Sequence, residues 1–368
     1  MAATLELFLE LARLSTPPGR ERAAIDHVRA ELASFGVDAV EDDAGAQLGG
    51  DAGNLYARIP ATAPGTPLFF NAHVDTVPPT APIDPIIEGA YVVNRHPTIL
   101  GADNKATVAG MIDGIRRVVQ EGIPHAGIEL VITVQEEIGL LGAKAFDCDR
   151  LAARVGYVYD VDGAPGAMTM RAPSQITMDV EFHGRSAHAG MDPEQGRNAI
   201  HAAALALARL PMGRVAPGAS RNVGVIAGGT QRNVVPDRCS LQLEVRSLDD
   251  AHVVVLAQEM VDAVNAAAAE AGCSAEIAQT REYTAYAFGE DDEVVQIARR
   301  GLAAAGCPPR EIETGGGADA HAFNERGLQC LNLSSGMEAI HTPDERIEIR
   351  HVEALSRITV ELIRAAAT

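Results

Sequence analysis

Two kinds of hydrophobic pattern divide this chain, and their order along it limits the fold more than any other feature. Through residue 172, short apolar runs alternate with segments of helical period, and the same hydrophobic pattern returns from about residue 285. Between them, runs such as 176–182 alternate polar and apolar residues. The first pattern predicts a largely parallel α/β sheet, and the second predicts half-exposed antiparallel strands. We therefore expect one domain (1–172 plus 285–368) interrupted by another (173–284).

The inserted segment is expected to form a small α+β domain with four strands and two helices on one face. The predicted strands cover 176–182, 222–227, 240–246 and 275–283, and the predicted helices cover 198–210 and 250–271. The length of 368 residues also favours two domains, because one hydrophobic core rarely serves a chain of this size. The larger domain is expected to hold a mixed, mostly parallel sheet.

Charge and cysteine content exclude several classes of protein. Fifty acidic residues against thirty basic ones give a net charge of −20, which argues against nucleic acid or an anionic membrane as the main partner. Five scattered cysteines without a CxxC pair form neither a disulfide framework nor a thiolate zinc site. The first helix is amphipathic and no apolar run approaches the roughly 18 residues of a membrane span. These features predict a cytoplasmic protein.

Acidic residues and histidines stand where the predicted strands end or where a helix begins. The set consists of His73, Asp75, Asp103, Glu136, Glu137, Asp162 and His341. The carboxyl ends of parallel strands meet at one edge of a sheet, so these side chains are expected to converge. Nitrogen and oxygen donors without thiolates suit Zn²⁺, Mn²⁺ or Co²⁺, and their number suits two ions rather than one.

Each element of this set is weak evidence alone. A single His-x-Asp is more often a hydrogen-bonded surface or core pair, and two adjacent glutamates are usually solvated. Glu136 and Glu137, however, directly end the apolar strand 128–134. Two carboxylates at a buried strand end require a cation or a proton to be tolerated. The order and spacing of the whole set therefore favour a metal site.

The motifs resemble the M20 co-catalytic metallopeptidases, and most closely the peptidase T-like branch, whose founding member is a tripeptide aminopeptidase. The similarity runs from one end of the chain to the other. The matching stretches are 71–78, 100–106, 135–143, 161–163, 184–190, 315–320 and 340–342.

The resemblance implies a role for each metal-site residue. Asp103 corresponds to the carboxylate that bridges two ions, His73 and Asp162 to the terminal ligands of one ion, and Glu137 and His341 to those of the other. It implies two divalent ions per chain, with Zn²⁺ favoured over Mn²⁺ and Co²⁺.

One ligand assignment keeps an alternative. Asp160 and Asp162 lie two residues apart in a predicted strand and therefore point to the same face. The family motif aligns best on Asp162, because Gly163 follows it, and Asp160 is the alternative.

The resemblance also assigns catalytic roles beside the ligands. Glu136 corresponds to the general base, which takes a proton from the attacking water and returns it to the leaving amine. Asp75 corresponds to the carboxylate that orients the imidazole of His73. The family has a cis peptide after the bridging aspartate, so Asp103–Asn104 is expected to be cis.

In the inserted domain, the resemblance implies a lid that pairs with a second subunit. His188 would enter the partner's active site and stabilise the oxyanion, and the chain would form a homodimer. Asn233 and Arg246 match lid positions that hold the substrate, and Gly316, in a run of three glycines, would let the substrate backbone approach closely. A surface histidine and a solvated arginine are the alternatives.

Three functions remain open on the sequence. The residues of the motifs at 100–103 and 135–139 favour an aminopeptidase of tripeptides or other short peptides. The alternatives are an N-acyl-amino-acid deacylase or carboxypeptidase-like amidohydrolase and, more distantly, a non-catalytic peptide-binding relative, although neither a ligand nor the base is missing. His96 and His321 depart from the family pattern, and these departures concern the choice of substrate.

Overall fold

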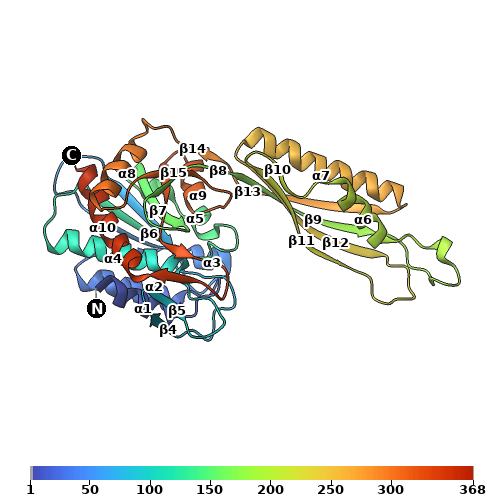
Figure 1. Cartoon of the computed structure of the whole chain (residues 1–368), viewed down its shortest axis with the longest axis horizontal. Helices are drawn as coiled ribbons and strands as arrows, with labels where there is room; N and C mark the ends of the chain where they lie inside the picture. The colour runs from blue at the N-terminus through green and yellow to red at the C-terminus, as the bar shows by residue number, and fades with distance from the viewer. Residues whose placement is uncertain (1–2, 368) are drawn as a thin grey trace. The chain divides into compact units, whose positions relative to one another are not determined.

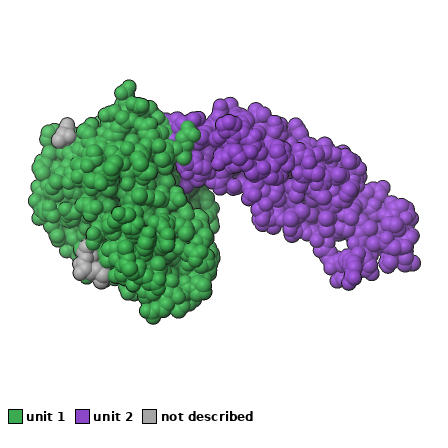
Figure 2. Space-filling model, in the orientation of Figure 1, with its two compact units in different colours: residues 1–170, 288–313, 318–368 green, residues 171–287, 314–317 purple. Residues whose placement is uncertain are grey.

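The computed structural model describes residues 3–367, which fold into two compact units (Figure 1, Figure 2). Unit 1 comprises the described residues through Met170, Phe288–Glu313 and those from Ala318 onward. Unit 2 comprises Arg171–Ala287 and Thr314–Gly317. The limits of the main insertion thus lie two and three residues from the expected ones.

The segment Thr314–Gly317 differs from the expected division into domains, because the sequence placed it in the larger domain. In the structure it belongs to unit 2, far from the rest of that unit in sequence. The Thr314 N–H donates to the Arg171 carbonyl oxygen, with 3.1 Å between the two atoms. Arg246 Nη1 donates to the Gly315 carbonyl oxygen at 2.9 Å. These bonds fasten the glycine run to unit 2.

The large sheet of unit 1 runs in the order β1-β2-β6-β3-β7-β16-β8, with β15 paired to β8 and β14 at the far end. Its central strands β6, β3, β7 and β16 are parallel to one another, as the sequence predicts, and β1 and β2 are antiparallel. The strands are β1 (Ala39–Glu41), β2 (Leu55–Ile59), β3 (Leu68–His73), β6 (Ile128–Thr133), β7 (Val155–Val161), β8 (Ala167–Ala172), β14 (Tyr286–Ala287), β15 (Arg310–Glu313) and β16 (Gln329–Ser334).

Helices of unit 1 pack around this sheet, and the pair α4 and α10 packs unusually closely. A Cβ atom at Gly110 would lie 2.3 Å from Leu355 Cβ, and one at Gly114 would lie 2.6 Å from Thr359 Cβ. Glycine is therefore required at both positions for this close helix contact. The helices are α1 (Ala3–Ala12), α2 (Arg22–Ser34), α3 (Ala44–Leu48), α4 (Ala102–Gln120), α5 (Leu141–Ala145), η1 (Cys148–Arg150), α8 (Glu293–Ala304), α9 (Ala320–Glu325) and α10 (Ile349–Ala366).

A second, smaller sheet of unit 1 was not expected from the sequence. It runs in the order β17-β18-β5-β4 and is antiparallel throughout. Its strands are β4 (Pro85–Glu88), β5 (Tyr91–Asn94), β17 (Met337–Glu338) and β18 (Arg346–Glu348). The β17–β18 hairpin contains His341, so this sheet supports one of the predicted metal ligands.

Unit 2 is an antiparallel sheet in the order β10-β11-β12-β9-β13 with α6 and α7 packed on it (Figure 1). Burial alternates along β12, as expected for a sheet covered on one face. The short strand β10 adds a fifth strand to the four that were predicted. The elements are β9 (Ser174–His183), η2 (Pro193–Gln195), α6 (Ala199–Arg209), β10 (Gly213–Ala216), β11 (Ala219–Gly228), β12 (Arg238–Ser247), α7 (Asp250–Glu270) and β13 (Ser274–Tyr283).

Among residues 3–367, no helix combines the length and the apolar character that crossing a bilayer requires.

Candidate metal centre

Six acidic and histidine side chains converge at one edge of the large sheet in unit 1. Three of the strands involved, β3, β6 and β7, are parallel, so their carboxyl ends lie at the same edge. The remaining side chains come from the start of α4 and from the β17–β18 hairpin. The six residues are His73, Asp103, Glu136, Glu137, Asp160 and His341.

Asp103 lies at the centre of this arrangement. Its Oδ1 is 3.2 Å from His73 Nε2, and its Oδ2 is 3.2 Å from His341 Nε2. His341 Nε2 is also 3.1 Å from Glu137 Oε2, and His73 Nε2 is 3.8 Å from Asp160 Oδ1. The two oxygens of Asp103 thus face two different imidazoles.

These contacts define two groups with a geometry suitable for metal ions. His73, Asp103 and Asp160 offer ligand atoms that all lie within 4.8 Å of one another, and so do Asp103, Glu137 and His341. Asp103 belongs to both groups, as a bridging carboxylate must. His73, Glu136 and Glu137 form a third such group, which places Glu136 directly beside the first two.

The donor atoms of this cluster fit a cation. His73 Nε2, Asp103 Oδ1 and Glu137 Oε1 are inaccessible to solvent and have no hydrogen-bond partner among the described residues. Buried polar atoms are normally paired, so a group of unpaired donor atoms that face one another is suited to binding a cation. Imidazole nitrogen and carboxylate oxygen are ligands that Zn²⁺, Mn²⁺ and Co²⁺ accept.

The electrostatics of the cluster also favour a bound cation. Burial raises the pKa of Glu136 well above its usual value, and the charges of Asp160 and Asp319 add to this effect. Burial also raises the pKa of Glu137 and of Asp160. Hydrogen bonds with Asp103 and Glu137 raise the pKa of His341 to about 10. So many crowded carboxylates repel one another unless positive charge is present among them.

The structure places Asp160, and not Asp162, within the candidate ligand groups of the described residues. Asp160 is on β7, its side chain is 8% exposed, and its Oδ1 accepts a hydrogen bond from Asn104 Nδ2 at 2.8 Å. Asp162 is exposed, and none of the candidate groups in the described residues includes it. The reason is that β7 ends at Val161 and the chain turns at Gly163, whose φ is +85°. Strand alternation therefore no longer applies to Asp162.

Asp75 connects two parts of the cluster, although not only in the predicted way. His73 Nδ1 lies 3.0 Å from the backbone oxygen of Asp75 and 3.4 Å from its Oδ1. The carboxylate of Asp75 accepts hydrogen bonds from the N–H groups of Glu136 (2.9 Å) and Glu137 (3.1 Å). Asp75 thus orients the imidazole mainly through its backbone, while its carboxylate orients the two glutamates.

The loops that present these residues have unusual backbone conformations. Gln135, Ala339 and His341 adopt positive φ angles of 53°, 54° and 62° without being glycine. Such conformations are sparsely populated and persist where the surrounding structure fixes them. The peptide bond between Asp103 and Asn104 is cis, as the family resemblance predicted.

Three buried carboxylates close to the cluster were not assigned a role from the sequence. Glu21 accepts hydrogen bonds from the N–H groups of Gly19 and Gln135, and Asp319 accepts one from the Thr133 hydroxyl. Glu345 accepts three from the N–H groups of Leu100, Gly101 and Asp103, around the start of α4. Asp319 lies within the matched stretch 315–320, whereas only the fold reveals what Glu21 and Glu345 contact.

His96 and His321 are not members of the candidate ligand groups found among residues 3–367. His321 is buried in α9, and its Nδ1 lies 3.0 Å from the Ala318 carbonyl oxygen. The backbone N–H of His96 donates to Asn94 Oδ1 at 3.3 Å. Both therefore contribute to local loop structure.

In unit 2, His188 stands in an exposed loop with its tautomer fixed. Its Nδ1 accepts hydrogen bonds from the N–H groups of Gly190 (3.2 Å) and Met191 (3.1 Å). Because both partners are donors, the ring proton lies on Nε2. The adjacent Ala189 N–H donates to the Asn233 carbonyl oxygen at 2.9 Å, so the predicted residues His188 and Asn233 are close neighbours.

Arg246 and Gly316 form a second, separate place in unit 2. Arg246 donates to the carboxylate of Glu244 and to the Gly315 carbonyl oxygen, next to Gly316. Arg246 lies near the end of β12, whereas Asn233 precedes its start at Arg238. The eight residue-to-residue steps from Arg238 to Arg246 span roughly 26 Å in an extended strand. The four predicted residues of unit 2 therefore fall into two distant pairs.

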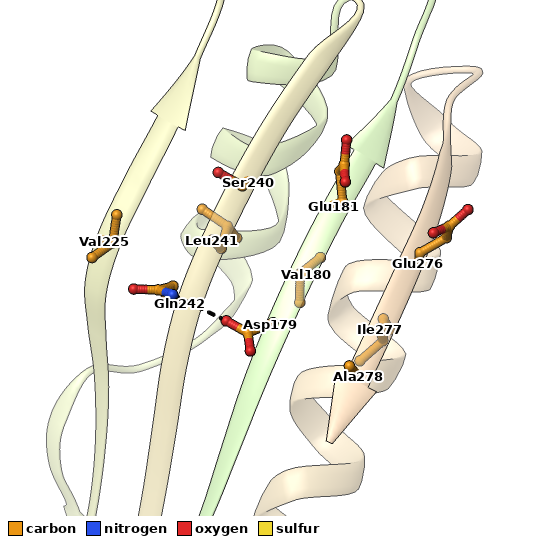
Figure 3. A pocket seen from close by; sticks show the side chains of 10 residues that line it. All are labelled: Asp179, Val180, Glu181, Val225, Ser240, Leu241, Gln242, Glu276, Ile277 and Ala278. Carbon is orange, nitrogen blue, oxygen red and sulfur yellow. Dashed lines mark hydrogen bonds between the residues drawn. The ribbon is translucent and has the colours of Figure 1, made fainter. Parts of the chain in front are cut away.

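A hollow on the sheet of unit 2 is unrelated to the metal cluster. Figure 3 shows its polar and apolar lining on β9, β11, β12 and β13, with the helices behind the strands. Gln242 Nε2 donates to Asp179 Oδ1 at 3.2 Å across it. None of the predicted site residues lines this hollow.

Known protein families match parts of both units. A family model of the peptidase dimerisation domain (M20) matches residues 173–272, and one of peptidase family M28 matches residues 54–181. The crystal structure of aminopeptidase PepT from Bacillus cereus is 36% identical, covers all of this chain and 98% of that one, and superposes with a TM-score of 0.90. The chain belongs to the M20 metallopeptidase family, in its peptidase T-like branch.

Two further relatives agree with this M20 assignment. A tripeptidase from Staphylococcus aureus is 32% identical over 99% of this chain and 98% of its own, with a TM-score of 0.94. The protein YqjE of Bacillus subtilis is 36% identical over 99% of this chain and 98% of its own. As a member of the peptidase T-like branch, this M20 enzyme is a metallopeptidase that hydrolyses peptide bonds.

Proposed function

We propose that this M20 enzyme is an aminopeptidase of short peptides, with tripeptides as its preferred substrates, and that it works with two Zn²⁺ ions. The observation that supports this most is the pair of ligand groups that share Asp103 and contain buried, unpaired donor atoms. The names of the relatives, an aminopeptidase and a tripeptidase, support the substrate class.

The ligand groups divide between two ions. His73 and Asp160 would hold one, Glu137 and His341 the other, and Asp103 would contact both. Zn²⁺ is the preferred ion because imidazole and carboxylate ligands suit it, although Mn²⁺ and Co²⁺ accept the same donors. Two such cations polarise the scissile carbonyl group and lower the pKa of a water molecule.

Glu136 acts as the general base and acid. It lies beside both ligand groups, with its Oε2 3.9 Å from His73 Nε2, and belongs to neither of the two groups that share Asp103. Its raised pKa suits a carboxylate that takes a proton from the attacking water and gives it to the leaving amine. The Asp75 carboxylate holds the backbone of Glu136 in place during both transfers.

His188 is the proposed hydrogen-bond donor to the oxyanion. Its Nε2–H is available as a donor because Nδ1 already accepts two backbone hydrogen bonds. A neutral donor aimed at a tetrahedral intermediate stabilises the charge that develops on its oxygen. Asn233, its neighbour, would contact the same substrate.

The distance within unit 2 favours a homodimer. His188 and Asn233 lie at one end of β12, and Arg246 and Gly316 lie at the other, so one chain cannot apply all four to a single short peptide. We propose that His188 and Asn233 serve the active site of a second copy, while Arg246 and Gly316 contact substrate in their own chain. The match to a peptidase dimerisation domain supports this arrangement.

The free edge of β11 is the proposed dimer surface. Strand β10 pairs with residues 219–221 of β11, and no strand among residues 3–367 pairs with residues 222–228 on that side. Val225 and Ile226 on this stretch are exposed, at 46% and 53%. Unpaired edges that carry exposed apolar side chains are suited to pairing between chains.

The five cysteines are free thiols, four of them buried. Free thiols are typical of a reducing compartment, and we propose that the enzyme works in the cytoplasm.

Turnover against a matched set of substrates tests the proposed function. The enzyme reconstituted with Zn²⁺, Mn²⁺ or Co²⁺ is assayed on a tripeptide, the same tripeptide with an acetylated N-terminus, the corresponding dipeptide and an N-acyl amino acid. We expect release of the N-terminal residue from the free tripeptide and little cleavage of the acetylated control. Faster cleavage of the N-acyl amino acid would instead favour a deacylase, and binding without turnover would favour a non-catalytic relative.

A further inference from the structure

Glu345 is a buried carboxylate that joins two distant loops of unit 1. It lies in the β17–β18 hairpin, four residues after His341, and is 2% exposed. Its Oε2 accepts hydrogen bonds from the N–H groups of Leu100 and Gly101, both at 2.8 Å. Its Oε1 accepts one from the N–H group of Asp103 at 3.0 Å.

These three bonds hold the loop that presents Asp103. Gly101 is left-handed, with φ +77°, and Asp103 is not helical, with φ −78° and ψ 104°. The first N–H groups of a helix have no partner within the helix, so an irregular start leaves several donors unsatisfied. Glu345 satisfies three donors of this segment together and thereby fixes its conformation.

Burying a carboxylate is unfavourable, which makes this arrangement informative. Burial raises the pKa of Glu345 to about 7, and the three backbone donors act in the opposite direction. An apolar side chain would avoid this penalty but would leave three buried N–H groups unpaired. The carboxylate therefore serves the loop rather than its own hairpin.

We propose that Glu345 is a positioning residue that keeps the His341 hairpin and the Asp103 loop in register for metal binding. The register matters because Asp103 must present one oxygen toward His73 and the other toward His341, each 3.2 Å away. Glu345 belongs to none of the candidate ligand groups found among the described residues, and its two oxygens face backbone donors instead. This inference rests on the proposed two-metal site.

The test compares Glu345→Gln with Asp344→Asn. Glutamine keeps the size of the side chain but replaces one accepting oxygen with an NH₂ group, so at least one backbone donor loses its acceptor. We expect the affinity for Zn²⁺, measured by competition with a chromophoric chelator, to fall by about 10-fold or more. Asp344 is the exposed neighbour in the same hairpin, and its variant should bind Zn²⁺ within about 2-fold of the parent.

A merely structural role predicts a different result. In that case Glu345→Gln would lower the melting temperature of the metal-free protein while the folded variant bound Zn²⁺ as tightly as the parent, and the proposal would be overturned. The metal readout does not depend on peptide cleavage. A parent enzyme that binds two ions but cleaves no peptide would refute the proposed function and leave the role of Glu345 intact.

Amide hydrogen exchange covers the outcome in which Glu345→Gln does not fold. In the metal-free parent protein, the N–H groups of Leu100, Gly101 and Asp103 should exchange at least about 100-fold more slowly than unstructured amides, because Glu345 holds all three. Exchange at the unprotected rate would show that the carboxylate does not hold this loop, and would overturn the proposal without any variant.

Discussion

The two units of this M20 enzyme present their site residues in opposite ways. In unit 1, six side chains from separate strands, a helix and a hairpin converge, and most of them are buried, as His73 is at 2% exposure. In unit 2, His188 and Asn233 are exposed, and they lie about a strand's length from Arg246. The candidate ligand groups of unit 1 are formed by elements that pack together, whereas we propose that the exposed residues of unit 2 contact substrate from a partner surface.

The difference extends to how the side chains are held. The glutamates of unit 1 are fixed through the carboxylate of Asp75, and the Asp103 loop through that of Glu345, in both cases across long distances in sequence. The imidazole of His188 accepts hydrogen bonds from N–H groups two and three residues ahead of it in the chain. Changes in unit 1 should therefore disturb metal binding or chemistry strongly, and changes in unit 2 should act through the substrate.

The largest effect is expected for Glu136→Gln in unit 1. Loss of the proton-transferring carboxylate should lower kcat by about 10⁴-fold, the upper end for a general acid–base residue. Zn²⁺ content, measured by elemental analysis of the purified variant, should stay at the level of the parent, since Glu136 is outside the two groups that share Asp103. Near-parental turnover would eliminate Glu136 as the base.

Asp160→Asn and Asp162→Asn form a matched pair of variants. They compare a buried with an exposed aspartate two residues further along the chain. Asp160→Asn should weaken Zn²⁺ binding by more than about 100-fold, because even partners outside the ligand shell contribute 10–100-fold. Asp162→Asn removes the same charge at an exposed position and should bind Zn²⁺ like the parent. The opposite ranking in a chelator competition would restore the assignment made from the motif.

His188→Ala tests the unit 2 side of the comparison. It should lower kcat by about 100-fold, the size expected for one oxyanion donor, and leave Zn²⁺ binding unchanged. Mixed dimers of His188→Ala with Glu136→Gln then reveal the source of the histidine. If His188 acts in the partner, such a dimer contains one site with both residues intact and regains activity. Mixed dimers as inactive as either parent variant would argue against exchange between subunits.

The smallest effect concerns Glu21, which is buried in unit 1 and has one oxygen without a hydrogen-bond partner. Burial raises its pKa from 4.5 to about 7. The folded protein thus binds the proton more tightly than the unfolded chain, and this stabilisation is complete below about pH 4.5 and lost as the pH rises through about 7.

Urea unfolding of the metal-free protein at about pH 5 and about pH 8 measures this dependence. Glu21→Gln should make it shallower, because glutamine has no proton to lose, while Glu345, whose pKa is also raised to about 7, keeps its own share. Asp38→Asn, at an exposed position, is the control and should leave it unchanged. An equally steep dependence in Glu21→Gln would assign it to other groups.

Much of the organisation could be predicted because hydrophobic periodicity reports burial directly. The parallel centre of the unit 1 sheet followed from apolar runs, and the antiparallel sheet of unit 2 followed from strict alternation. The small sheet that contains β17 and β18 was missed because its strands are only two to four residues long. Such strands contain too few residues for a period to be recognised.

The candidate metal site was likewise only partly predictable from the sequence. The convergence of His73, Asp103, Glu137 and His341 was predictable because each follows a strand or opens a helix. The choice between Asp160 and Asp162 was not, since it depends on where β7 ends and the chain turns. No spacing rule points from Glu345 to Asp103, which are 242 residues apart.

The sequence by itself determined the two hydrophobic patterns, the kinds of ligand atom and the family, because these depend on residue type and order. Tertiary structure alone decided which aspartate faces the metal site, which carboxylates hold its loops and how far His188 lies from Arg246. Those features depend on strand ends and on hydrogen bonds between segments remote in the chain. Local sequence cannot encode them, because each arises only when several elements are packed together.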